Sequence, residues 1–224
     1  MATGPVNLAS QKTLEDPLAY LPCSTIQQFK RGAVIYGHGR PCDSLYLVLA
    51  GAVKITRVAD HGRQVLLDLY RTDEFFGEIS LMNLSNEAEQ AISHQKTTLM
   101  AWPTAAIEDL IVKRPRLAVA LLQAFGQRLH GLTRRMESLF FDPIDRRLAL
   151  SLIRFSERLG TAQPDGSVVM EPLTHELLAQ YVGTSREVVN CHMTNLRRLG
   201  YVTYSRKAIV LYRDALIAWL KQVD

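Results

Sequence analysis

Short runs rich in aliphatic and aromatic residues recur through the first half of the chain, separated by glycines and polar residues. Within SLYLVLA (residues 44–50) leucines alternate with other apolar residues, which predicts a strand that buries at least one face. Runs of the same kind are AVIY (33–36), AVKITRV (52–58), QVLLDLY (64–70) and TTLMAW (97–102). Asp60-His61-Gly62 predicts the tip of a hairpin between two of them. These features predict a compact β-roll or barrel over residues 21–102.

A long amphipathic segment follows, in which apolar residues recur every three or four positions. Pro115 can occupy the first turn of a helix that runs to about Phe140. Such a helix is about 35 Å long, at roughly 1.5 Å per residue, and exceeds what a small roll can cover. We therefore expect part of its stripe to form a homodimer interface, the alternative being a helix packed wholly on its own domain. The stripe comprises Leu117, Leu121, Phe125, Leu129, Leu132, Met136 and Leu139.

Shorter helices flank the long one and define the domain organisation. A short amphipathic helix is predicted over residues 104–112. Asp142-Pro143 should end the long helix, because proline disfavours helical geometry in the preceding residue, and a helix over residues 144–159 follows. The chain then divides into a flexible lead (1–20), a β-roll (21–114), the long helix with its hinge (115–142) and a C-terminal domain (143–224).

The segment 174–199 has the residue types of a helix-turn-helix. Thr174 can cap a first helix, and Gly183 supplies the positive φ that ends it. Thr184 and Glu187 have the spacing of a capping box that would start the second helix. The small residue Ala179 lies four positions before the glycine, where two steeply crossing helices approach closely.

The outward side of the second predicted helix carries residues that hydrogen-bond to base edges or phosphates: Ser185, Arg186, Glu187, Asn190 and Thr194. After it, the alternation in residues 201–212 predicts a two-stranded wing with Ser205-Arg206-Lys207 at its tip. A final helix over 214–223 should close the domain.

Composition narrows the functional classes. The chain has 224 residues, of which 47% are hydrophobic and 21% charged, as in ordinary globular proteins. No run approaches the roughly 18 apolar residues of a membrane-spanning helix, and no secretory signal is visible, so we expect a cytoplasmic protein with no membrane partner. The net charge is +4, yet residues 186–213 carry six arginines and lysines against one acid. This local excess predicts a nucleic-acid surface.

Cysteine and histidine spacing predicts no metal site. Cys23, Cys42 and Cys191 are widely separated, and the six histidines form no ligand pair at helical spacing. The sequence also has no nucleophile-base pair, carboxylate pair or phosphate loop, so we do not expect an enzyme.

Three segments together carry a resemblance to a known family: GAVIYGHGRPCDSLYLVLAGAVKI (32–55), FFGEISLMN (75–83) and TSREVV (184–189). They resemble the cyclic-AMP receptor protein and fumarate-nitrate regulator (CRP/FNR) superfamily of bacterial transcription factors, over roughly residues 21–224. The resemblance implies an α+β fold: an N-terminal β jelly-roll of the cyclic-nucleotide-binding kind, a long dimerisation helix and a C-terminal winged helix-turn-helix.

By this resemblance Arg186 and Glu187 read bases. The receptor-protein branch has a further arginine four residues after the glutamate, where this chain has Cys191, so Asn190 or His192 is expected to take over part of the readout. Residues expected to hold phosphates are Thr174, Ser185, Arg206 and Lys207.

The effector is not identified by the sequence. In the cyclic-nucleotide branch a Gly-Glu pair contacts the ribose, which Gly77 and Glu78 match, and an Arg-Ser or Arg-Thr pair about ten residues later holds the cyclic phosphate. Ala88 and Glu89 stand there instead, and a carboxylate repels phosphate, so cyclic AMP is not expected. Cys23 and Cys42 lack the close spacing of the fumarate-nitrate branch's iron-sulfur ligands, and His94 is the sole candidate for a haem ligand. Candidate effector-contacting residues are Gly77, Glu78, Ile79, Ser80, Glu89 and Thr133.

The sequence thus predicts a homodimeric regulator that binds palindromic double-stranded DNA, acts with RNA polymerase and senses an unknown small molecule or none. Two alternatives stay open: an effector-independent activator controlled by its abundance, and a ligand-sensing module that acts through protein partners.

Overall fold

Two four-stranded antiparallel sheets form the N-terminal roll in the computed structural model, which describes residues 14–58, 64–82 and 89–222. All five predicted runs are strands. Strands β1 (Thr25–Phe29), β6 (Phe75–Phe76) and β7 (Glu89–Ser93) were not predicted, and in β1 and β7 polar residues obscure the apolar pattern of a strand. The predicted hairpin tip at residues 60–62 lies outside the described residues. One sheet has the order β1 (Thr25–Phe29), β8 (Thr97–Pro103), β3 (Ser44–Ala50), β6 (Phe75–Phe76), and the other β2 (Val34–Tyr36), β7 (Glu89–Ser93), β4 (Ala52–Val58), β5 (Gln64–Arg71).

Strand β3 is buried on both faces. Tyr46 and Val48 point into the roll interior, where they pack with Phe76. Leu45 and Leu47 point outward, onto the helices that follow the roll. The alternating side chains of β3 therefore belong to two separate apolar clusters, one inside the roll and one between the roll and the helices.

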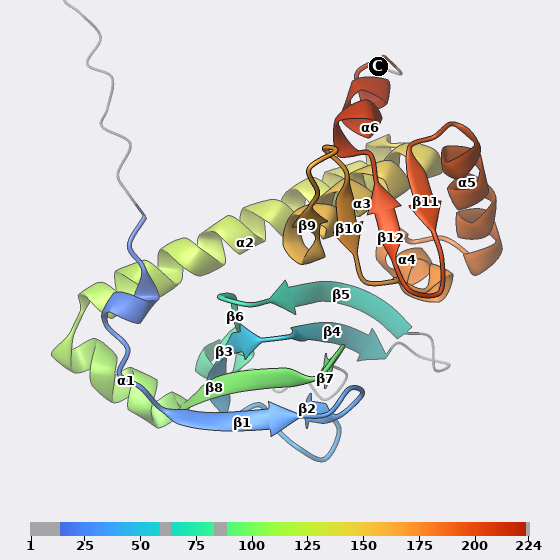
Figure 1. Cartoon of the computed structure of the whole chain (residues 1–224). Coiled ribbons are helices and arrows are strands. Elements are labelled where there is room, and N and C mark those ends of the chain that lie inside the picture. Colours follow the sequence, from blue (N-terminus) through green and yellow to red (C-terminus); the bar gives the residue numbers. More distant parts are fainter. Residues whose placement is uncertain (1–13, 59–63, 83–88, 223–224) are drawn as a thin grey trace, which may run out of the picture.

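Helices α1 (Thr104–Lys113), α2 (Arg116–Phe141) and α3 (Ile144–Leu159) follow the roll, and α2 crosses it diagonally to reach the C-terminal unit (Figure 1). The first turns of α2 cover the outer face of β3 and β8. Leu117 is fully buried there and Leu121 is 4% exposed, packed against Ile107 and Trp102. Their assignment to a dimer interface is therefore wrong, because these two leucines are already buried within their own chain.

Residues 14–20 are ordered, contrary to the prediction that they belong to a flexible lead. Pro17–Ala19 form a 3-10 helix that packs on α2. Glu15 fixes it, since its carboxylate lies 2.7 Å from Arg116 Nη1 and its backbone N–H donates to Gln123 Oε1 at 2.8 Å.

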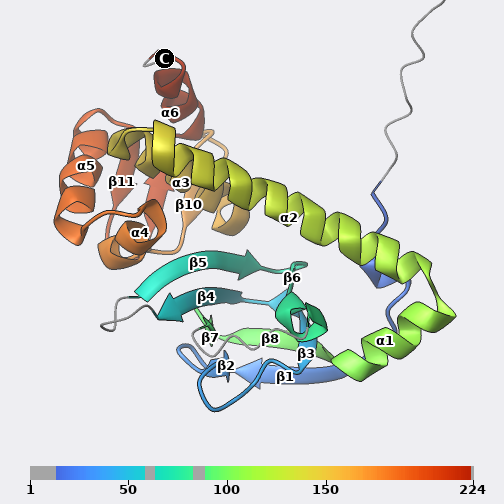
Figure 2. The same cartoon turned by 180° about the vertical axis from the view of Figure 1, so that it is seen from behind.

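The C-terminal unit is a winged helix built on α3. Its sheet has the order β11 (Val202–Tyr204), β12 (Ile209–Leu211), β10 (Val168–Met170), β9 (Thr161–Ala162). Its core includes Phe155, Leu178, Val189 and Met193. Leu66 and Leu69 of β5 join the same core, so the roll and the winged helix are packed against each other (Figure 2). The remaining elements are α4 (His175–Val182), α5 (Arg186–Arg198) and α6 (Arg213–Leu220).

Candidate nucleic-acid interface

Helix α4 begins and ends as the sequence predicts. Thr174 caps α4, because its Oγ1 accepts a hydrogen bond from Leu177 N at 3.1 Å. Gly183 ends the helix with φ +76°. A Cβ at Gly183 would lie 3.2 Å from Leu139 Cδ2, so glycine also allows α2 to approach the turn.

The start of α5 differs by one residue from the prediction. Ser185, not Thr184, is the N-cap, and its Oγ accepts from Val188 N at 3.3 Å. The predicted capping box of Thr184 with Glu187 is therefore wrong. Glu187 instead receives hydrogen bonds from its own backbone N–H and from Ser185, which hold the pKa of its carboxyl below the usual value. It stays charged on the exposed first turn.

The outer side of α5 faces solvent while its inner side is core. Val189, Met193 and Leu196 are buried. His192 is half-buried and is therefore less available to DNA bases than predicted. The exposed side carries Arg186, Glu187, Asn190, Cys191 and Thr194. The structure thus brings the predicted base-reading residues onto one accessible helix face of the width that a DNA groove admits.

A cluster that the sequence did not reveal joins the wing to both helices. His175, the first residue of α4, packs edge-on against the Tyr204 ring with centroids 5.5 Å apart. The guanidinium of Arg197 on α5 lies 5.1 Å from the centre of the same ring. Burial, and secondly the positive charge of Arg186, hold the pKa of His175 below its usual value.

The two basic residues at the wing tip have different surroundings. Ser205 Oγ accepts from Lys207 N at 3.1 Å and from Ala208 N at 3.2 Å, which closes the turn. Arg206 and Lys207 are both exposed. Lys207, however, also lines a cleft of about 780 Å³ between the wing and the roll, together with His94 and Gln95. Burial is the main cause that lowers the pKa of His94, the sole candidate for a haem ligand.

An exposed apolar seam runs along the distal part of α2. It starts at Leu122, which is 72% exposed and was missed in favour of its neighbour Leu121. Leu129 and Met136 follow at intervals of seven residues and are 65% and 57% exposed. A second row at the same interval consists of Phe125, Leu132 and Leu139, which are partly or well exposed. Two rows with a seven-residue repeat have the pattern of a coiled-coil seam.

The roll interior contains an arginine where the effector was expected. Arg128 reaches in from α2, and its Nη1 lies 3.0 Å from Glu78 Oε1. Its guanidinium stacks over Tyr70, 4.1 Å from the ring centre. Residue 77, next to Glu78, must be glycine, because a Cβ there would lie 2.6 Å from Ser44 O and its φ is +86°.

Carboxylates and aromatic rings surround this arginine. Tyr36 donates a hydrogen bond from its hydroxyl to Glu89 Oε1 at 3.0 Å, and the rings of Tyr36, Tyr46 and Phe76 stack. Burial raises the pKa of Glu78 to about 7, and the charges of Glu89 and Asp68 act in the same direction. The described part of the site is therefore acidic and aromatic.

The predicted effector residues are only partly brought together. Gly77, Glu78 and Glu89 are close to one another, and Ile79 and Ser80 belong to the 3-10 turn Glu78–Met82. Ser80 Oγ is buried and has no hydrogen-bond partner in the described part of the chain. The assignment of Thr133 to the pocket of its own chain is wrong: it lies on the exposed side of α2, where its Oγ1 donates to Leu129 O at 3.0 Å. Residue 88 lies outside the described residues.

Comparison with known proteins finds family models that match two parts of the chain. Residues 26–114 match the family model of the cyclic nucleotide-binding domain, and residues 146–219 match that of the Crp-like helix-turn-helix domain. A "CRP-like cAMP-activated global transcriptional regulator" of Mycobacterium tuberculosis is 30% identical over 183 residues, which is 82% of each chain. The chain belongs to the CRP/FNR family of transcription regulators.

Other members of the CRP/FNR family are similar over most of their length. A global nitrogen regulator of Synechococcus elongatus is 27% identical, covering 86% of this chain and 88% of that protein. The crystal structure of a CRP/FNR-family regulator from Thermus thermophilus superposes with a TM-score of 0.73 at 30% identity, covering 88% of this chain and 98% of the other. The predicted fold class and family are thereby confirmed.

The described residues of this CRP/FNR regulator contain neither a membrane-spanning helix nor a cluster of metal ligands. Among residues 14–58, 64–82 and 89–222, no helix has the length and apolar character needed to cross a bilayer. Within the same ranges, no three histidine, cysteine or acidic side chains come together as metal ligands.

Proposed function

We propose that the chain acts in the cytoplasm as a homodimer that binds a palindromic double-stranded DNA site and regulates transcription with RNA polymerase. The observation that carries the proposal is the exposed outer side of α5, where Arg186, Glu187 and Asn190 project from a helix whose opposite side is core. The exposed seam of α2 supports a second copy, because an apolar row that begins at Leu122 gains free energy from pairing.

Base reading follows from the side chains on α5. The Arg186 guanidinium can donate two hydrogen bonds to guanine O6 and N7, worth about 1 to 3 kcal/mol of discrimination. Glu187 can accept from cytosine N4, and Asn190 can pair with adenine N6 and N7. Cys191 offers no comparable donor, so the half-site differs from that of relatives with arginine there.

Phosphate contacts hold the unit in register. The hydroxyl of Thr174 accepts a hydrogen bond from its helix and keeps its own O–H for a phosphate oxygen, whereas Ser185 must turn its O–H from Glu187 to make such a contact. Arg206 and Lys207 at the wing tip supply positive charge. The loss of counterions from DNA should make binding depend on salt concentration.

The roll is proposed not to take cyclic AMP, although the Mycobacterium relative is named for it. Glu89 stands in the region where the family's cyclic-phosphate arginine is expected, and Glu78 is held by this chain's own Arg128. A cyclic phosphate would meet two carboxylates and would have to compete for one arginine.

A second candidate function is that of an effector-independent activator, and the position of Arg128 favours it. Arg128 pairs with Glu78 at 3.0 Å and lies 3.7 Å from Asp68, so the chain's own cation already occupies the acidic interior. Native mass spectrometry of the protein as isolated distinguishes a sensory roll from an effector-independent activator. A bound small molecule supports a sensory roll, and a bare dimer that binds DNA tightly supports the second candidate.

The test of the main proposal is selection of sites by the full chain from double-stranded oligonucleotides with a random central region. We expect palindromic sites with guanine in each half, enriched equally with and without cyclic AMP. Enrichment only with cyclic AMP would contradict the proposal that the roll does not bind cyclic AMP. Failure to enrich any sequence, with an affinity independent of salt, would favour a ligand-sensing module that acts through protein partners.

A further inference from the structure

Strand β5 carries a bulge on the side that faces the winged helix. In its pairing with β4, Asp68 is opposite Ile55 and Leu66 is opposite Thr56, so Leu67 has no partner residue. A bulge disturbs the ladder and bends the strand, leaving backbone groups to be satisfied by other parts of the molecule.

A single guanidinium from α2 satisfies these groups. Arg135 donates to Leu66 O at 3.0 Å through Nη2, and to Leu67 O through Nη1. The same Nη2 donates to Tyr181 O at 2.9 Å, and the guanidinium lies 3.8 Å from the centre of the Tyr181 ring. Tyr181 is in the last turn of α4, where carbonyls have no partner within the helix. Arg135 therefore joins the long helix, the roll and the helix-turn-helix.

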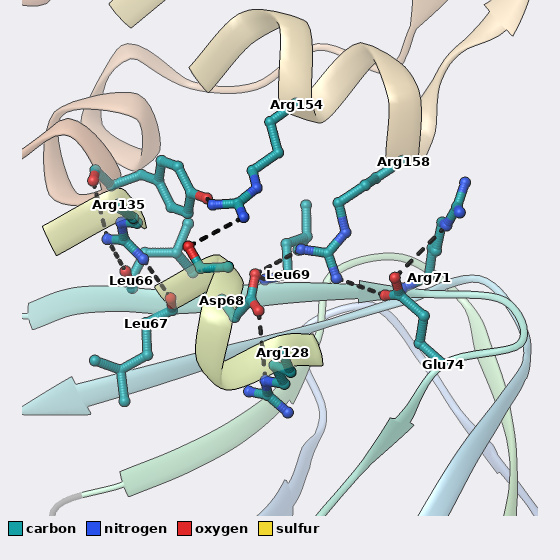
Figure 3. A network of polar contacts seen from close by, with 12 residues as sticks. Leu66, Leu67, Asp68, Leu69, Arg71, Glu74, Arg128, Arg135, Arg154 and Arg158 are labelled. Atoms are coloured by element: carbon teal, nitrogen blue, oxygen red, sulfur yellow. Dashed lines mark hydrogen bonds and ion pairs between the residues drawn. The ribbon is translucent and has the colours of Figure 1, made fainter. Parts of the chain in front are cut away.

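Two arginines of α3 reinforce the contact (Figure 3). Arg158 Nη1 lies 2.7 Å from Asp68 Oδ1, and its Nη2 lies 2.6 Å from Glu74 Oε2. Burial opposes the charge of Arg158, but these carboxylates outweigh it and raise its pKa. Arg154 donates to the Tyr181 hydroxyl at 3.2 Å. We call Arg135, Arg154 and Arg158 the arginine junction.

The orientation of the winged helix matters because the DNA repeat is rigid. Two recognition helices on a dimer must lie about one helical turn, ~34 Å, apart. One base pair changes that separation by about 3.4 Å. The backbone joins the winged helix to α2 only through Asp142 and Pro143, so its placement depends on non-covalent contacts.

We propose that Arg135 is a positioning residue for DNA recognition, which fixes the winged helix on β5 in the free chain and so sets the spacing of half-sites that the dimer accepts. This inference rests on the proposed homodimeric DNA binding. It identifies a residue that touches no DNA yet determines which palindromes are bound.

The geometry requires arginine at this position. A guanidinium presents several N–H donors in a fixed planar fork, whereas a lysine ammonium is a compact charge that cannot reach three carbonyls and stack on a ring together. The matched control is the adjacent Arg134. It is exposed and makes no hydrogen bond or ion pair within the described ranges. Arg135→Lys and Arg134→Lys therefore make the same chemical change, inside and outside the junction.

The first experiment needs no DNA and uses native cysteines. Cys23 on the roll and Cys191 on α5 are exposed, whereas Cys42 is half-buried and burial raises the pKa of its thiol to about 12, which should slow its labelling. Spin labels on both exposed thiols report the distance between the two units in dimers made with excess unlabelled chain. We expect a narrow distribution for wild type and Arg134→Lys, and a broad one for Arg135→Lys. Equal widths for all three would overturn the fixing role, whether or not the protein binds DNA.

The second experiment measures binding of the full chain to the selected palindrome with its spacer lengthened or shortened by one base pair. Wild type and Arg134→Lys should lose about tenfold in affinity for each change, and Arg135→Lys about threefold or less, because a loose unit tolerates wrong spacing. Simple destabilisation would reduce binding to all spacers equally and leave these ratios unchanged. Unchanged ratios in Arg135→Lys would therefore refute the proposal, whereas wild type failing to bind any palindrome would refute the proposed function.

Discussion

Truncation of Leu129 tests whether the seam of α2 pairs two chains. The side chain is 65% exposed in the single chain, so a partner would bury most of it. Complete burial of a leucine is worth about 1.5 to 3 kcal/mol, so Leu129→Ala should cost about 1 to 2 kcal/mol per chain. The two copies in a dimer double this to about 2 to 4 kcal/mol. Dimer dissociation should then rise roughly thirtyfold to several hundredfold.

Sedimentation velocity over a dilution series gives the dimer dissociation constant directly. Leucine and alanine have similar helix propensities, so the helix itself should be little affected. The matched control is Val112→Ala, which truncates a side chain that is 82% exposed on α1, away from the seam. An unchanged dissociation constant for Leu129→Ala, or an equal loss in the control, would refute the interface.

Three further predictions concern the DNA face and the roll. Arg186→Gln should remove the preference for guanine at one position, by about 1 to 3 kcal/mol in competition binding, while non-specific binding persists. Lys207→Ala should weaken binding to every site and reduce the slope of log affinity against log salt by about 1. Glu78 has a folded pKa of about 7 against an ordinary 4.5, so the folded chain holds an extra proton between these values. The free energy of unfolding should therefore fall as pH rises from the ordinary pKa to the folded one, by up to about 3 kcal/mol in all. Glu78→Gln should remove that dependence in urea titrations at pH values spanning about 4.5 to about 8.

Local signals made the helix-turn-helix predictable from the sequence. Caps such as Thr174 and the left-handed Gly183 act within one turn of the backbone, so a short stretch of sequence specifies them. The one error at the start of α5 arose where Thr184 and Ser185 are adjacent and both are good N-cap residues. Their tertiary surroundings decide between them, and these are not visible in the sequence.

The seam of α2 was less predictable because adjacent leucines are equivalent in a sequence pattern. Leu121 and Leu122 both fit an apolar stripe, yet the first is 4% exposed and the second 72%. What separates them is the outer face of β3 and β8, which covers one side of the helix. A seven-residue repeat counted from Leu129 in both directions selects Leu122, so that repeat was the signal available.

The arginines of α2 and α3 show where sequence reasoning could not succeed. In the sequence they look like the solvated side of amphipathic helices. In the fold, Arg128 and Arg135 of α2 and Arg158 of α3 all contact β5, although tens of residues separate them from it in the sequence. Their acceptors are partly backbone carbonyls at a bulge, which leave no trace in residue type. These charges are used within the chain, so the net charge of +4 does not measure the surface offered to phosphates. The cations that we propose for phosphate contacts are those of the wing tip, and their small number should set the salt dependence of binding.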